Sequence, residues 1–243
     1  MSRNESFPAL SVARISAHLT GAAVEICPDD IDDVHVMVSG DAPDTLQISF
    51  SAGTLRITQR TTAPARARHP GGWTQLTLRV PRAWKGSIDA RTRSGRISLR
   101  QLSGADLSLR TVSGLVMGSE LHFITVRAAS LTGEVKLSGL RCEKCSMLSA
   151  TGSLAIQDGV TPLGSAFTAT GDVSLTLLDA FDALQLASVT GKLDVRAPVQ
   201  TCDAGLRSIT GRIHAEGMAI GDAPHSIRAT TVTGPLALTC NLE

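Results

Sequence analysis

The feature of this 243-residue sequence that most restricts its fold is a Ser/Thr-Gly step that recurs at almost constant spacing. Four successive intervals between these glycines are 19 residues, two are 20 and the last is 23. Self-similarity at a short fixed period is the signature of a repeat architecture. The eight glycines are Gly95, Gly114, Gly133, Gly152, Gly171, Gly191, Gly211 and Gly234.

Apolar and polar residues alternate on both sides of each glycine. The residue two positions after it is always apolar, as at Val135, and the residue three positions before it is always Ser or Thr. A period of two predicts strands with one buried face, so each repeat should form two short strands joined by a sharp corner. Glycine suits this corner if the backbone needs a positive φ there. The hydroxyls are expected to bond the backbone at the bend or to stack between repeats.

The repeats predict an all-β fold, a single-stranded β-solenoid (β-helix) of about eight coils of 19–20 residues spanning 86–243. Coils stacked about 4.8 Å apart satisfy one another's backbone groups, and the right hand is the default for parallel crossovers. Residues 1–85 alternate without the glycine register, which predicts an irregular N-terminal β cap carrying a basic loop at 61–72. A leucine-rich repeat would need an Asn/Cys ladder, and a propeller blade about 40 residues, so both fit less well.

Charge is distributed unevenly along the chain although the net charge is only +1. Residues 1–55 carry two basic against eight acidic residues, and residues 56–110 carry twelve basic against two acidic residues. The basic residues of the first coils are either a solvated face or a contact for an anionic partner: the acidic N-terminal segment of another subunit, a phospholipid headgroup or a polyanion. Because aromatic residues are only 3% of the chain, specific nucleic-acid binding is not expected. The candidate anion-binding residues are Arg91, Arg93, Arg96, Arg100 and Arg110.

Few residues suggest catalysis. Cys142 and Cys145 form a lone Cys-x-x-Cys, which is at most half of a zinc or redox site, and Cys145 takes the inward position of the repeat. Buried thiols are therefore the better interpretation of this pair. The acidic residues form no aligned ladder, and the six histidines fall in unrelated registers. The sequence thus predicts neither an enzyme nor a cofactor.

Two segments carry a family resemblance. LTLRVP at 76–81 and SIDARTRSGRISL at 87–99, followed by repeated Thr-Val-Ser-Gly and Val-Thr-Gly steps, resemble the bacterial DUF4097 family, over roughly residues 20–240. The resemblance implies a β-solenoid with an N-terminal cap. Members are often labelled "putative adhesins", a label inferred from the fold, and no catalytic or ligand-binding residue comes with the motif.

The sequence therefore favours a non-enzymatic scaffold that presents a solenoid surface to a protein partner or to itself, as a homo-oligomer. An adhesin-like, glycan-binding role at the cell surface is the alternative, and a zinc or redox function at Cys142 and Cys145 ranks third. No apolar run approaches the roughly 20 residues that span a bilayer, and the N-terminus lacks a signal-peptide core. A cytoplasmic location is expected, or the cell envelope if a signal sequence has been removed.

Overall fold

The computed structural model describes residues 2–40, 43–59 and 74–241, and nearly all of its regular structure is β-strand. Two short 3-10 helices, η1 (Ala9–Ser11) and η2 (Pro43–Thr45), are the exceptions in this part of the chain. None of the described helices is long and apolar enough to cross a bilayer. The predicted basic loop at 61–72 lies outside the described residues.

The strands form two sheets of twelve, here called sheet A and sheet B. In spatial order, sheet A contains β1 (Ser2–Pro8), β4 (Asp33–Gly40), β7 (Thr74–Pro81), β3 (Ala23–Asp29), β9 (Ile97–Arg100), β11 (Val116–Ser119), β13 (Val135–Ser138), β15 (Leu154–Gly159), β17 (Val173–Leu177), β19 (Leu193–Ala197), β24 (Leu236–Cys240) and β21 (Ile213–Glu216). Sheet B contains, from the opposite end, β22 (Ala219–Ile220), β20 (Thr201–Ser208), β23 (Ser226–Thr233), β18 (Ala183–Thr190), β16 (Leu163–Thr170), β14 (Arg141–Ser149), β12 (His122–Ser130), β10 (Ser103–Thr111), β8 (Ser87–Thr92), β2 (Arg14–Leu19), β6 (Thr54–Gln59) and β5 (Leu46–Ser51).

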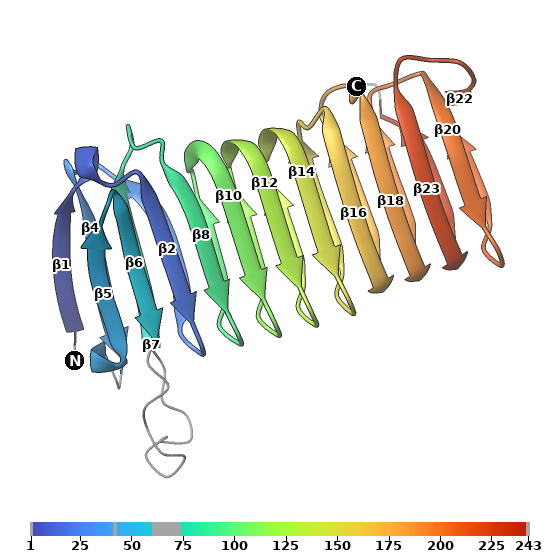
Figure 1. Ribbon diagram of the computed structural model, residues 1–243. Helices are drawn as coiled ribbons and strands as arrows, with labels where there is room; N and C mark the ends of the chain where they lie inside the picture. Colours follow the sequence, from blue (N-terminus) through green and yellow to red (C-terminus); the bar gives the residue numbers. More distant parts are fainter. Residues whose placement is uncertain (1, 41–42, 60–73, 242–243) are drawn as a thin grey trace, which may run out of the picture.

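Each repeat contributes one strand to each sheet, and equivalent strands stack in parallel along the molecule (Figure 1). In sheet B, Val126 lies between Leu107 and Cys145, each 19 residues away in sequence. Alternate residues of both sheets point inward and form one hydrophobic core between them. Leu102, Leu121 and Leu140 fill the turns that join consecutive coils. The predicted all-β repeat fold is confirmed, and most of its inward positions are buried. The exceptions include Ile213 and Ala215, which are exposed on the edge strand β21.

The corner glycines are required for a different reason from the predicted one. Gly152 does not have a positive φ. A Cβ atom on Gly152 would lie 1.9 Å from the carbonyl oxygen of Gly133 in the preceding coil, and one on Gly133 would lie 1.8 Å from the oxygen of Gly114. The glycines are thus stacked in direct backbone contact, which leaves no space for a side chain. A φ between +145° and +157° accompanies this contact only at Gly171, Gly191 and Gly234.

The hydroxyl three residues before the corner glycine accepts a hydrogen bond from the glycine N–H at five corners, those of Gly95, Gly114, Gly133, Gly152 and Gly211. At the other three corners the equivalent hydroxyl donates to the carbonyl oxygen of the corner glycine in the neighbouring coil. The backbone N–H of Gly133 donates a hydrogen bond of 2.7 Å to the Ser130 hydroxyl, and that of Gly152 donates one of 2.8 Å to Ser149. Both serines are buried. This side-chain acceptor is needed because an N–H group buried at a sharp bend is otherwise costly.

The coils do not stack in sequence order at the two ends. The coil made by β6 and β7 lies outside the coil made by β2 and β3, which in turn contacts β8 and β9. At the other end, β23 and β24 lie between β18–β19 and the outermost strands β20–β21. Antiparallel strands β1, β4 and β5 cover the N-terminal end. The strands β2, β3, β6 and β7 therefore extend the same two sheets beyond the eight coils that the glycines predict.

Candidate interaction face

The five predicted arginines do not share one face. Arg91 and Arg110 point outward from sheet B, Arg100 points outward from sheet A, and Arg93 and Arg96 flank the corner between the sheets. Arg100 makes an ion pair of 2.6 Å with Glu25. Arg96 and Arg100 line an open groove of about 420 Å³ on sheet A, together with Lys136 and several serines.

Arg91 is held by a local carboxylate. It donates hydrogen bonds of 3.0 and 2.8 Å to the two carboxylate oxygens of Asp89, and a ring nitrogen of His18 lies 3.4 Å from the same group. Partial burial tends to raise the pKa of Asp89, but the hydrogen bonds from Arg91 and His18 outweigh it and lower that pKa below its usual range. Arg91 is consequently less available to an anionic partner than Arg93 and Arg110, the other two arginines on the sheet B side.

Sheet B carries an exposed apolar surface that starts next to these arginines. Register along the sheet places two columns of outward residues on the face, one at the fourth and one at the second position before each corner glycine. We call the apolar part of these columns the apolar band. Its members on the six strands from β10 to β23 are Val112, Ala129, Leu131, Leu148, Ala150, Phe167, Ala169, Ala187, Val189 and Val232. Ile209, directly after β20, is a further exposed apolar residue of the column at the second position before the glycine.

The large side chains of the apolar band are well exposed. Leu131, Leu148 and Val189 have relative exposures of 52%, 56% and 50%, and Leu163, at the start of the same strand as Phe167, adds a further exposed side chain on this face. Parallel sheets usually have both faces covered, and contiguous exposed apolar surface of this kind marks interaction sites. The outward face of sheet B therefore has the character of an interface that lacks its partner.

Cations border this band along a diagonal. From the corner of β8 the diagonal passes through Arg93, Arg110 on β10, Arg127 on β12 and Lys144 on β14. None of these four side chains makes an ion pair within the described chain. We call them the basic border. Two of its members, Arg93 and Arg110, are among the arginines singled out from the sequence.

The outward face of sheet A differs in kind. Its charged residues pair with one another, as in Lys136–Glu134 at 2.9 Å and Lys192–Asp194 at 2.7 Å. Met117, at 38% exposure, is an isolated apolar residue among serines, lysines and acids. Sheet A is thus a self-neutralised polar surface, and sheet B is the face with unsatisfied apolar and basic groups.

The apolar band was visible in the sequence but was missed. Aligned on the glycine, the outward column four residues before it changes from Arg91 and Arg110 to Leu148 and Phe167 along the array. The inward apolar positions and the arginines are the stronger patterns in the same alignment. The signal is an apolar residue at a position that the period of two assigns to solvent.

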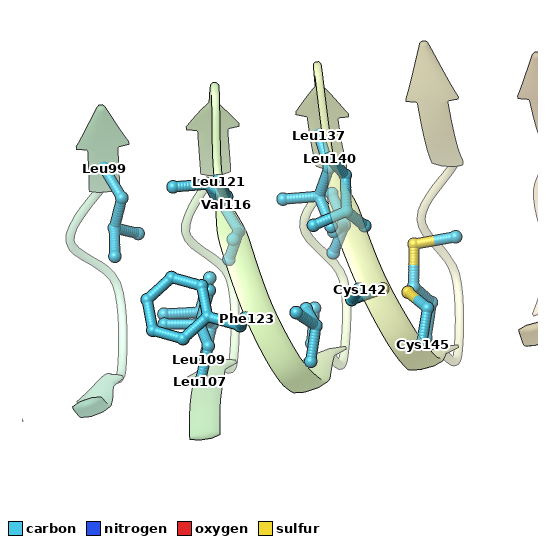
Figure 2. Close-up of a cluster of buried hydrophobic side chains, with 14 of the residues drawn as sticks. Leu99, Leu107, Leu109, Val116, Leu121, Phe123, Leu137, Leu140, Cys142 and Cys145 are labelled. Atoms are coloured by element: carbon cyan, nitrogen blue, oxygen red, sulfur yellow. The ribbon is translucent and has the colours of Figure 1, made fainter. Parts of the chain in front are cut away.

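Cys142 and Cys145 are both buried in the core, beside Phe123 and Leu140 in the close-up of Figure 2. A hydrogen bond with Cys145 lowers the pKa of Cys142, and the same bond together with burial raises the pKa of Cys145. No group of three potential metal ligands gathers anywhere in the described residues. The pair has the environment of two core thiols, as the inward register of Cys145 predicts.

Two parallel sheets built from stacked coils, closed at one end by antiparallel strands, define the class of β-solenoid-like repeat proteins. A sequence profile of the Toastrack DUF4097 family matches residues 12–223. The chain belongs to this family, which confirms the resemblance seen in the sequence.

Solved structures share this fold over nearly the whole chain. Two are called "putative adhesin", from Parabacteroides distasonis (TM-score 0.64, 13% identity) and from Bacteroides fragilis (0.60, 14%). A third, called "Putative lipid binding protein", is also from Parabacteroides distasonis (0.59, 16%). Each alignment covers 98% of this chain and 96% of the other. Among curated proteins, none matches the chain by sequence.

Proposed function

We propose that the protein is a non-enzymatic scaffold that binds a protein partner through the apolar band and the basic border of sheet B. The observation that carries this proposal is the continuous apolar surface on the outer face of a parallel sheet, a surface that in other proteins is normally covered. The unpaired cations at its edge would orient the partner, since rim charges add specificity more than affinity. All five cysteines are free thiols, which supports a reducing, cytoplasmic location.

Site-specific photo-crosslinking tests this proposal. A photo-reactive amino acid at Leu148 on sheet B should give a discrete cross-linked protein product in cells, and the same amino acid at Met117 on sheet A should not. Both residues are exposed and lie on strands in the middle of the array. Absence of any protein cross-link from Leu148, or equal yields from the two positions, would refute the proposed function.

A glycan-binding role is the second candidate, in line with the adhesin names of the structural relatives. The observation in its favour is the groove on sheet A, where Arg96, which makes no ion pair among the described residues, lies beside serine hydroxyls and the ion-paired Arg100 and Lys136. These groups suit a carboxylated or sulfated sugar, although no aromatic ring lines the groove for stacking. Retention on an anionic glycan array that is lost on Arg96→Ser, while Leu148→Lys has no effect, would favour this role over the first.

A further inference from the structure

The apolar band has an internal symmetry that identifies one partner in particular. Resting on the proposed function, we propose that this partner is a second copy of the chain, packed with sheet B against sheet B. The two-fold axis would run parallel to the strands and pass between β14 and β16, the two strands in the middle of the band. Such an axis keeps the strand directions of the two sheets aligned, which is a common geometry for stacked sheets.

The residues of the band are self-complementary about this axis. Three coils on one side, β10, β12 and β14, meet β23, β18 and β16 of the other copy in that order. Leu148 then faces Phe167 of the partner subunit, Leu131 faces Val189 of the partner subunit, and Val112 faces Val232 of the partner subunit. Ala150 and Ala169, the small residues, meet at the axis, where the two sheets approach most closely. Apolar residues thus meet apolar residues at every position of both columns except where Arg110 faces Thr230 of the partner subunit.

The charged residues of the face also fit this arrangement. Arg127 faces Gln185 of the partner subunit, and Lys144 faces Leu163 of the partner subunit, over which its aliphatic stem can lie. Asp106, a further outward charge of these coils, faces Ser226 of the partner subunit. No like charges oppose one another among these coils. In the next pair of coils Arg91 on β8 faces Arg207 of the partner subunit, and the Asp89 carboxylate that binds Arg91 offsets this repulsion.

A two-fold axis along the stack fits the face less well. Such an axis exchanges the two ends of every strand, so at mid-strand it would place Leu131 against Thr125 of the partner subunit and Ala150 against Lys144 of the partner subunit. Placed between the two columns of the band it would pair Leu148 with Ala150 of the partner subunit, but the two sheets would then overlap only over their corner halves. The axis parallel to the strands lets the full width of both sheets overlap with apolar residues paired.

The face that contains the band is large enough for a specific dimer. At about 3.3 Å per residue and 4.8 Å per strand, the two columns of the band project roughly 400 Å² over six strands, and the two outward columns that carry Arg127 and Lys144 bring the face to roughly 750 Å². Two copies that cover this whole face would bury about 1,500 Å² in total. Specific interfaces begin at about 1,000 Å². A bilayer is a poorer occupant, because the sequence has no Tyr and the Trp among the described residues, Trp84, is buried, whereas membrane-interface surfaces are rich in these residues.

Sedimentation equilibrium of the full chain tests the proposal. The wild-type protein should be a dimer at micromolar concentration, and Leu148→Lys should raise the dissociation constant at least about 100-fold, because each dimer receives the lysine twice. The matched control, Met117→Lys on sheet A, should dimerise as the wild type does. A wild-type protein that stays monomeric at 100-fold higher concentration, or equal weakening by both variants, would overturn the proposal.

Cysteine cross-linking tests the position of the axis. In Ala169→Cys a short bismaleimide should link two chains in high yield, and in Ser174→Cys, on the sheet A strand of the same coil, it should not. Equal yields would refute face-to-face packing.

Vesicle flotation tests lipid as the alternative occupant. If the monomeric protein floats with phosphatidylglycerol vesicles and Leu148→Lys abolishes this, the band binds lipid and the proposed second copy is wrong. Photo-crosslinks from Leu148 to a different protein alone would overturn the second copy and leave the proposed function standing.

Discussion

At the scale of single residues, the stacking of the coils requires that the corner residues of the eight repeats have no Cβ atom. Each corner glycine lies against the carbonyl oxygen of the corner residue in the neighbouring coil, which is Ala22 for Gly95 and another glycine for the other seven. The coils approach one another at this edge as closely as backbone atoms allow. The glycine requirement is therefore a property of the stack and not of one coil.

Replacement of Gly152 by alanine should consequently destabilise the protein by about 2–3 kcal/mol or more, because its Cβ atom would overlap the oxygen of Gly133 at 1.9 Å. Urea unfolding followed by circular dichroism measures the effect. Gly221→Ala is the matched control, since a Cβ atom there meets nothing within 4 Å and should change stability by less than about 0.5 kcal/mol. Equal effects of the two changes would show that close contact is not the reason for glycine.

Asp89 should make the free energy of unfolding depend on pH. The pKa of its carboxyl is lower in the folded state than in the unfolded chain, where it is about 3.9. Its contribution is therefore fully present above that unfolded pKa and is lost as pH falls through the lower, folded pKa. Asp89→Asn should reduce the free energy of unfolding at pH 7, and the difference from wild type should shrink below about pH 4. A difference that is constant with pH would contradict this account.

At the scale of the strand, the alternate residues of each sheet B strand have two different roles. In β14, Met147 is buried at 1% exposure and Leu148, the next residue, is exposed at 56%. The inward residues specify the core, and the outward residues specify what the face can bind. Substitution at the two kinds of position should therefore affect different measurements.

Met147→Lys should lower the free energy of unfolding by at least about 3 kcal/mol, because it places a charge in the core. Leu148→Lys should change the stability of the monomer by less than about 1 kcal/mol and act on association alone. Chemical denaturation at low protein concentration separates the two effects. A large loss of monomer stability from Leu148→Lys would show that this side chain also supports the fold.

How far the sequence predicts the structure follows from the same alternation. The inward positions, the corners and the buried thiols at Cys142 and Cys145 were predictable, because period and spacing specify them directly. The division of the arginines between two faces was not resolved, since Arg93 and Arg96 lie at the corner where the faces meet. The order of the terminal coils could not be predicted either. All coils present nearly the same edges, so pairing preferences do not distinguish one neighbour from another. The right hand of the coil stays a prediction.

At the scale of the whole molecule, spatial order and chain order diverge at the ends of the stack. The strands β20 and β21 form the outer coil, and all four residues of β21 are exposed. The last strands of the chain, β23 and β24, lie one coil further in and are largely buried on their inner side. Local stability should follow position in the stack rather than position in the sequence.

Hydrogen exchange should show this order directly. Amides of β23 and β24 have neighbours on both sides and should exchange more slowly than those of β21 and β22, which lie earlier in the sequence but at the edge. Mass spectrometry of peptic fragments measures the difference. Faster exchange in 226–240 than in 213–220 would mean that the terminal coil is not inserted in solution.

The inserted coil also changes how this end of the array responds to proteolysis. The edge coil of β20 and β21 has a neighbour on one side only, whereas the coil of β23 and β24 lies between it and β18–β19. An endopeptidase cuts most readily in the segment that opens most easily, which is the edge coil. A cut there leaves β23 and β24 paired with β18 and β19, so the nicked protein keeps most of its stack.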